Sequence, residues 1–255
     1  MSAELTLEVT DSVAILTLRN PPLNLLTSEL REALTDQAGR IAANREIRAV
    51  VLAGGSSAFS AGSDIREFPP DAQAGLELAR REHACCQAIE SMPQPVVAAL
   101  EGHVLGGGVE LAVACDLRVA STEAVFGLPE ARLGVFPGEC AASLPLLIGP
   151  SRAKWLMLMG EPVAAAEAHR IGLVDELTAP GSALQRAVEV ANVIAANPAL
   201  AVQAINAAVD AAVHGSAESR RAEDEQTMSS MFESYDAREG VQAFLDKRPP
   251  VFRHH

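Results

Sequence analysis

The stretch that decides the fold is Pro95-Val-Val-Ala-Ala-Leu-Glu-Gly-His-Val-Leu-Gly-Gly-Gly-Val-Glu110. Its short apolar run, Val96 to Leu100, predicts a buried strand with a turn behind it. Three glycines at 106–108 and the apolar pattern after them predict a turn that opens a helix. Glycines let another group approach the backbone, and the first N–H groups of a helix have no partner inside it. Such a turn suits an anion or a developing oxyanion, although a tight packing turn with a surface glutamate is the alternative.

Outward from this stretch, strands alternate with helices through residue 120, which is an α/β pattern. Segments 5–9 and 13–18 predict a hairpin, and residues 49–53 and 117–120 predict further buried strands. Helices are expected at 27–43, 72–91, 107–115, 138–148, 151–159, 163–170, 182–196, 199–213, 217–234 and 237–246. We therefore expect a core domain over residues 1–197 and a helical region over 198–255. The second region has apolar helix faces that could form an oligomer interface.

The composition restricts the class of protein. The 255 residues carry a net charge of −13 and are 49% hydrophobic, which favours a large folded domain over a disordered chain. So acidic a chain is a poor candidate for non-specific binding to nucleic acid or to an anionic membrane. The cysteines, Cys85, Cys86, Cys115 and Cys140, match no zinc spacing, so we expect no metal and reduced thiols. With no secretory pattern at the N-terminus, the predicted location is the cytoplasm.

A second glycine turn, Phe59-Ser-Ala-Gly-Ser-Asp64, follows the strand predicted at 49–53. Two such turns, each offering one free N–H group, could hold one oxygen atom from two sides. One donor of this kind lowers a reaction barrier by roughly 2.7–4 kcal/mol.

Two glutamates, Glu110 and Glu130, follow apolar segments near these turns. Taken singly, each is more often a solvated surface residue. A pair of carboxyl groups in an apolar cavity, however, tends to split its proton affinities, so that one stays ionised and the other holds a proton. Addition of water to a double bond needs both a proton acceptor and a proton donor.

Motifs along nearly the whole chain resemble the crotonase family, also called the enoyl-CoA hydratase/isomerase family. They are Arg19-Asn-Pro-Pro-Leu-Asn24, Arg48-Ala-Val-Val-Leu52, Phe59 to Arg66, Pro95 to Glu110, Cys115-Asp116, Phe126-Gly-Leu-Pro-Glu130, Leu133-Gly-Val-Phe-Pro-Gly138, Ala168 to Asp175 and Glu239 to Arg248. The resemblance implies a spiral of β-β-α turns, a C-terminal helical trimerisation region, and assembly as a homotrimer or a dimer of trimers.

The same resemblance implies an acyl-CoA thioester substrate, with coenzyme A as part of the substrate and no separate cofactor. The oxyanion hole would be the N–H groups of Ser63 and Gly107. Glu110 would hold and activate water, and Glu130 would give a proton to the α-carbon. The implied substrate-binding residues are Leu25, Ala61, Gly62, Asp64, Ile65, Gly106, Pro129 and Gly138.

The leading hypothesis is hydration of a 2-enoyl-CoA, as in fatty acid β-oxidation, because both glutamate positions are filled. The runner-up is isomerisation of a 3-enoyl-CoA to a 2-enoyl-CoA, which needs only one well-placed carboxylate, or another acyl-CoA reaction of the family. A third possibility is an acyl-CoA-binding or scaffold protein that has lost turnover. The segment from Glu139 to Pro145 departs from the family's glycine-rich pattern, which leaves the acyl group open. Glu139 is interpreted as a helix-start charge, with a third site carboxylate as the alternative.

Overall fold

The computed structural model describes residues 3–214 and 217–254; residues 1, 2, 215, 216 and 255, which fall in the predicted regions 1–197 and 198–255, lie outside the described residues. Strand β3 (Ala49–Ala53) shows how the fold is built. All five residues are buried, and they alternate between two cores. Val50 and Leu52 join one hydrophobic cluster, whereas Val51 joins the other. A strand covered on both faces needs a continuous apolar run, which is what the sequence supplies.

The first sheet has six strands in the order β1-β2-β3-β5-β7-β10. The predicted hairpin of β1 (Glu4–Thr10) and β2 (Val13–Arg19) is confirmed as an antiparallel pair. The remaining strands pair in parallel: β5 (Val96–Leu100), β7 (Leu117–Ser121) and β10 (Glu176–Thr178). The short strand β10 was not predicted.

A second sheet has the order β4-β6-β8-β9. Its strands are β4 (Ala58–Ser60), β6 (His103–Leu105), β8 (Val125–Gly127) and β9 (Val163–Ala164). The chain three times forms a strand of the first sheet, a strand of the second and then a helix. These units are β3-β4-α2, β5-β6-α3 and β7-β8-α4, which confirms the predicted spiral of β-β-α turns.

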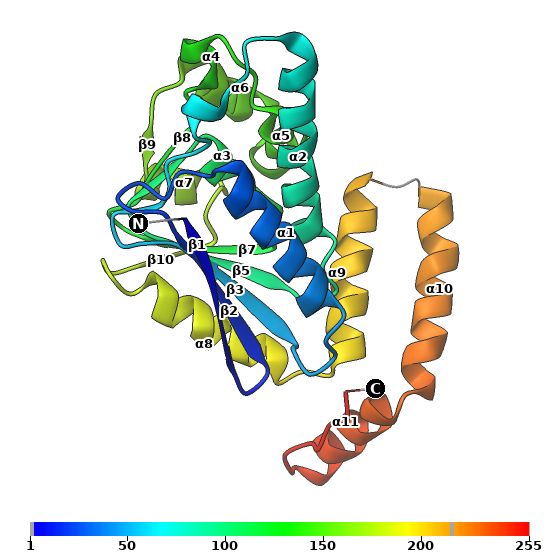
Figure 1. The fold of residues 1–255 in the computed structure, drawn as a ribbon. Helices are drawn as coiled ribbons and strands as arrows, with labels where there is room; N and C mark the ends of the chain where they lie inside the picture. Colours follow the sequence, from blue (N-terminus) through cyan, green and yellow to red (C-terminus); the bar gives the residue numbers. More distant parts are fainter. Residues whose placement is uncertain (1–2, 215–216, 255) are drawn as a thin grey trace.

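Helices flank and extend these sheets (Figure 1). They are α1 (Ser28–Ala42), the 3-10 turn η1 (Ile65–Glu67), α2 (Ala72–Glu90), α3 (Gly107–Ala114), α4 (Glu130–Leu133), α5 (Gly138–Ile148), α6 (Pro150–Met159), α7 (Ala165–Arg170), α8 (Ala183–Ala195), α9 (Ala199–His214), α10 (Ala217–Glu233) and α11 (Tyr235–Asp246). The helix predicted at 163–170 is wrong in its first two residues, because they pair with β8 as strand β9.

Helix α8 covers one face of the six-stranded sheet because its small side chains recur every four residues. Ala187, Ala191 and Ala195 are buried in the same cluster as Val51 and Val97. Helices α9, α10 and α11 lie to one side of the sheets, in the part of the chain coloured gold to red (Figure 1). Among the described residues no single helix has the length and apolar character to cross a membrane; α8 and α9 meet that test only as a pair, and they bend by 110°.

Candidate active site

The carboxyl ends of three neighbouring strands create the site. Strands β4, β6 and β8 run parallel to one another, so their last residues meet at one edge of the small sheet. The segment 61–63 follows β4, residues 106–107 follow β6, and residues 129–130 follow β8. Segments more than 20 residues apart in the sequence are thereby brought side by side.

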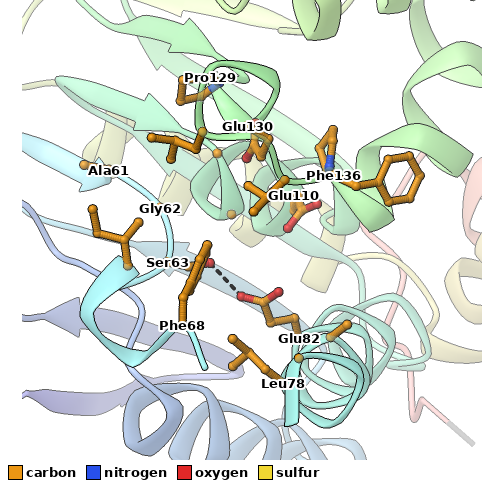
Figure 2. Close-up of a pocket in the computed structure, with 18 of the residues that line it drawn as sticks. Ala61, Gly62, Ser63, Phe68, Leu78, Glu82, Glu110, Pro129, Glu130 and Phe136 are labelled. Atoms are coloured by element: carbon orange, nitrogen blue, oxygen red, sulfur yellow. Dashed lines mark hydrogen bonds between the residues drawn. The ribbon is translucent and has the colours of Figure 1, made fainter. Parts of the chain in front are cut away.

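A cavity of about 270 Å³ opens at this edge (Figure 2). Its lining comes from the two glycine turns, from η1 and α2, and from the segment that carries α4. The lining residues are Ala61, Gly62, Ser63, Ile65, Phe68, Pro69, Gly75, Leu78, Ala79, Glu82, Gly106, Gly107, Glu110, Pro129, Glu130, Leu133, Val135, Phe136 and Pro137. The wall is therefore largely apolar, with three carboxyl groups in it, which is typical of a small-molecule site.

The two glycine turns approach each other too closely for side chains. Gly62 has φ +102°, and a Cβ atom there would lie 3.0 Å from the Leu105 carbonyl oxygen and 3.4 Å from the Gly107 nitrogen. Gly106 has φ +52°, and its Cβ would lie 2.8 Å from Glu130 Oε1. The left-handed backbone favours glycine at both positions, and at Gly62 the neighbouring main-chain atoms also leave no room for a side chain.

Two backbone donors remain available at this contact. The segment around Ser63 is fixed by neighbouring bonds, since the Leu26 N–H donates to the Gly62 carbonyl at 2.9 Å and the Asp64 N–H donates to the Leu26 carbonyl at 3.1 Å. Within the described ranges, neither the Ser63 N–H nor the Gly107 N–H is paired with a protein acceptor. Gly107 is the first residue of α3, where an N–H has no partner inside the helix.

Glu110 lies one turn into α3 and is 6% exposed. Burial raises the pKa of its carboxyl group to about 7, and the negative charges of Glu82 and Glu130 add to this effect. Arg31 and a hydrogen bond from the Glu139 N–H, at 3.2 Å, act in the opposite direction. The group can therefore change its protonation state near neutral pH, which suits proton transfer.

Glu130 is the half-buried first residue of α4, a short helix that is not among the predicted ones. Burial raises the pKa of its carboxyl group, and Glu82 adds to the rise. Its Oε2 atom is buried without a hydrogen-bond partner in the described part of the chain. Glu110 and Glu130 therefore present two carboxyl groups of raised pKa to the same cavity.

Most of the predicted site residues meet at this cavity. Both glutamates predicted to be catalytic and both predicted oxyanion residues line it, as do the predicted substrate-binding residues Ala61, Gly62, Ile65, Gly106 and Pro129. Their chemical roles stay predictions.

Three of the predicted substrate-binding residues lie outside the lining. The Leu25 carbonyl accepts a hydrogen bond from the Asn20 side chain, Asp64 is buried in an ion pair with Arg66, and Gly138 begins α5. Their predicted contacts with substrate remain untested.

Sequence reasoning missed Glu82, the third carboxylate of the cavity, and its partner Arg31. A signal was present in α2, because Gly75, Leu78, Ala79 and Glu82 follow the spacing of one helix face and all line the cavity. What the sequence lacked was any sign that this face points toward the glycine turns.

The third carboxylate of the cavity is therefore Glu82 and not Glu139, for which this role was the alternative interpretation. The Glu139 side chain lies in the first turn of α5 and pairs with His83, with Oε1 2.8 Å from Nδ1. Its connection to the site is through its backbone, since its N–H donates to Glu110. The described residues contain no group of three or more histidine, cysteine, aspartate or glutamate residues arranged to hold a metal ion.

Comparisons with known proteins agree with this geometry. A family model described as enoyl-CoA hydratase/isomerase matches residues 8–255. A Bacillus subtilis (strain 168) protein named "Probable enoyl-CoA hydratase" is 36% identical, over 98% of this chain and 98% of its own. The short-chain-enoyl-CoA hydratase of Clostridium acetobutylicum is 33% identical, over 95% and 94% of the two chains. The solved structure of an enoyl-CoA hydratase from Bacillus anthracis superimposes with a TM-score of 0.93 at 32% identity, covering 98% of this chain and 99% of that one.

The fold and the site thus define a crotonase-type protein, as the sequence motifs predicted. The chain belongs to the enoyl-CoA hydratase/isomerase family. Members of this family act on acyl-CoA thioesters without a separate cofactor.

Proposed function

We propose that the protein is an enoyl-CoA hydratase that adds water syn across the double bond of a 2-enoyl-CoA to give a 3-hydroxyacyl-CoA. The observation that carries the proposal is that two carboxyl groups of raised pKa share one cavity with two backbone N–H groups that have no acceptor among the described residues. Hydration needs all four, whereas isomerisation needs one carboxylate and the two donors.

The proposed oxyanion hole is made by the N–H groups of Ser63 and Gly107. As the oxygen of water bonds to the β-carbon, the electrons of the double bond move toward the thioester oxygen. Two donors aimed at that oxygen stabilise the enolate-like charge, at roughly 2.7–4 kcal/mol for each donor. Rigid strand ends hold the donors, so little reorganisation is needed during the reaction.

The proposed acid–base roles are those that the family resemblance implies for these two positions, and the raised pKa of both carboxyl groups supports proton transfer there. In its ionised form Glu110 accepts a proton from water as the new C–O bond forms. In its protonated form Glu130 gives a proton to the α-carbon. The product has gained one water molecule, and transfer of a proton from Glu110 back to Glu130 restores the starting state. Glu110 titrates near pH 7, so both of its forms are accessible under ordinary conditions.

The acyl group is proposed to lie among Leu78, Leu133 and Phe136, which give the cavity an apolar wall. The coenzyme A end is proposed to extend past Ile65 toward the exposed side chain of Arg66. A substrate of fatty acid β-oxidation fits this arrangement.

The decisive experiment is a spectrophotometric assay with crotonyl-CoA, because hydration removes the absorbance of the conjugated thioester. We expect Glu110→Gln and Glu130→Gln each to lower kcat by about 10²- to 10⁴-fold, the usual contribution of an acid–base group. Glu77→Gln, on the exposed face of α2, is the matched control and should keep the wild-type rate.

Wild-type hydration by the Glu130→Gln variant would refute the proposal. If the protein instead created conjugated absorbance from a 3-enoyl-CoA and left crotonyl-CoA unchanged, the activity would be that of an isomerase. No reaction with either substrate would favour an acyl-CoA-binding protein.

We further propose assembly as a homotrimer or a dimer of trimers. The C-terminal helices carry exposed apolar side chains, among them Ile205 and Val209 on α9 and Phe244 on α11, the last 84% exposed. Exposed apolar patches of this kind mark association surfaces. Light scattering after gel filtration should give at least three times the chain mass of 26.7 kDa.

Variants test whether these helices form the interface. Val209→Glu should lower the measured mass, whereas Val9→Glu on the edge strand β1 should leave it unchanged. A monomeric wild-type protein would contradict the proposal.

A further inference from the structure

A buried polar network lies behind the glycine turns and reaches the cavity through one carboxylate. Arg31 on α1 is 2% exposed, and its Nη2 atom donates to Ser63 Oγ at 2.7 Å and to Glu82 Oε1 at 2.9 Å. The Ser63 hydroxyl donates to the same Glu82 oxygen at 2.6 Å (Figure 2). Three side chains from α1, α2 and the first glycine turn therefore close a ring of short hydrogen bonds.

This ring touches both segments that carry the unpaired donors. Ser63 belongs to it directly. A Cβ atom at Gly107 would lie 2.8 Å from Arg31 Nη2 and 3.2 Å from Ser63 Oγ, so the guanidinium packs against the Cα atom of Gly107. The position of each N–H group is thus coupled to the same arginine.

Such a network is costly for stability alone. When an ion pair is buried, the desolvation of both charges offsets much of their Coulomb attraction. Proteins in which apolar residues of the same volume replace such a pair are often no less stable. Here Arg31 Nη1 is buried without a hydrogen-bond partner in the described part of the chain, which adds a further penalty. No partner in the described ranges occupies Glu82 Oε2, and Glu82 lines the cavity. A role at the site accounts for this arrangement better than packing does.

We propose that Arg31, Glu82 and the Ser63 hydroxyl form a positioning network that holds the Ser63 N–H group on the thioester oxygen. The inference rests on the proposed acyl-CoA chemistry of the same cavity. Glu82 acts through Ser63 and is a positioning residue. Loss of its carboxylate leaves the Ser63 hydroxyl and Arg31 Nη2 without the acceptor that they share, and misplacement of a reacting group by about 1 Å can cost about 10²-fold in rate.

The charge of Glu82 has a second effect, on Glu110. The groups facing the Glu110 carboxyl are Glu82 and Cys86 on α2, Glu130 on α4, Arg31 on α1, and Cys140 with the Glu139 N–H on α5. Among the charges, Glu82 is the largest contributor to the raised pKa of Glu110. Removal of that charge should move the ionisation of Glu110 to lower pH, and with it the acid limb of a pH–rate profile.

The test uses Glu82→Gln, Ser63→Ala and the double variant, with Glu77→Gln as the control on the same helix. Two readouts are needed. One is the kinetics of crotonyl-CoA hydration. The other is the near-ultraviolet absorbance of acetoacetyl-CoA bound to the protein, because an oxyanion hole favours the enolate of this β-keto thioester whether or not the protein hydrates anything.

For both single variants we expect kcat to fall about 10- to 100-fold with KM changed by less than about threefold, together with a smaller enolate absorbance. The double variant should be no worse than the more affected single variant, because both substitutions break one network. Melting curves at equal protein concentration exclude a folding defect, and Ser63→Ala removes only one hydroxyl group.

Unchanged kcat and enolate absorbance in folded Ser63→Ala would overturn the proposed positioning role of the network. Additive losses of kcat in the double variant would overturn it as well. A rise in KM alone would make Glu82 an ordinary binding residue and would also overturn the proposal. If the wild type enolises acetoacetyl-CoA but does not hydrate crotonyl-CoA, the hydratase assignment fails. The enolate absorbance of the variants then still tests whether the network positions the Ser63 N–H group. If the wild type does neither, both proposals fail.

Discussion

Substitution of Glu110 by glutamine should make the stability of the protein less sensitive to a rise in pH. The buried carboxyl group has its pKa raised from 4.5 to about 7, first by burial and then by the charges of Glu82 and Glu130. The folded state therefore binds this proton more tightly than the unfolded state does. The stability that the group contributes is fully present below the unfolded pKa and is lost as pH rises to the folded pKa. At ~1.36 kcal/mol per pH unit the full loss is about 3 kcal/mol. Glutamine at position 110 cannot ionise and avoids this loss.

Urea unfolding of the wild type and Glu110→Gln at pH 5 and pH 8 measures the effect. The isosteric amide keeps an oxygen that can accept the Glu139 N–H, so its other consequences should be similar at both pH values. The free-energy difference between variant and wild type should shift by about 2 to 3 kcal/mol in favour of the variant between pH 5 and pH 8. One protein concentration must be used throughout, since association also affects stability. Glu77→Gln should show no such shift. The same difference at both pH values would refute the burial argument.

Three further substitutions test the geometry of the site and its support. Gly62→Ala should lower kcat/KM about 10²-fold, because its Cβ would lie 3.0 Å from the Leu105 carbonyl oxygen in a backbone region that suits glycine; Gly39→Ala, with open space around it, should keep full activity. Asn24→Ala should lower the free energy of unfolding by about 2 kcal/mol in urea, because it removes a buried amide that donates to three main-chain carbonyl groups. Thr27→Ala should cost about 1 kcal/mol in the same assay, since the Thr27 hydroxyl caps α1; an unchanged midpoint would contradict that role.

Two central strands of the large sheet, β3 and β5, could be predicted because each is a five-residue apolar run. Ala49–Ala53 and Val96–Leu100 are buried throughout, so a run of consecutive apolar residues identifies each of them as a strand. Strands β4, β6 and β8 are three residues each, which is too short to show a periodicity. Their existence depends on pairing with one another across the spiral, so only a resemblance to a known fold could indicate them.

The same distinction explains which parts of the site were predictable. The Gly107 donor is encoded locally, because a glycine turn that opens a helix leaves the first N–H groups without partners inside it. Glu82 has no local sign of its position: it is one charged residue in a helix with a charged face, and only the packing of α2 against α1 and α3 turns it toward Ser63. The spacing that places it on the face of Leu78 and Ala79 was present but had no interpretation without that packing.

The proton affinity of Glu110 shows how the packing of neighbouring helices affects function. Its value is set by burial in α3, by carboxylates from α2 and α4, and by a guanidinium from α1. None of these contributions comes from the glycine turn that identifies the motif. Two chains with the same glycine turns and the same two glutamates can therefore differ in the pH at which Glu110 changes its charge. A change at position 82 alters that pH and the support of Ser63 together, because one carboxylate serves both. Helix α2, which supplies no predicted catalytic residue, is thus where we expect the chemistry of this cavity to be adjusted.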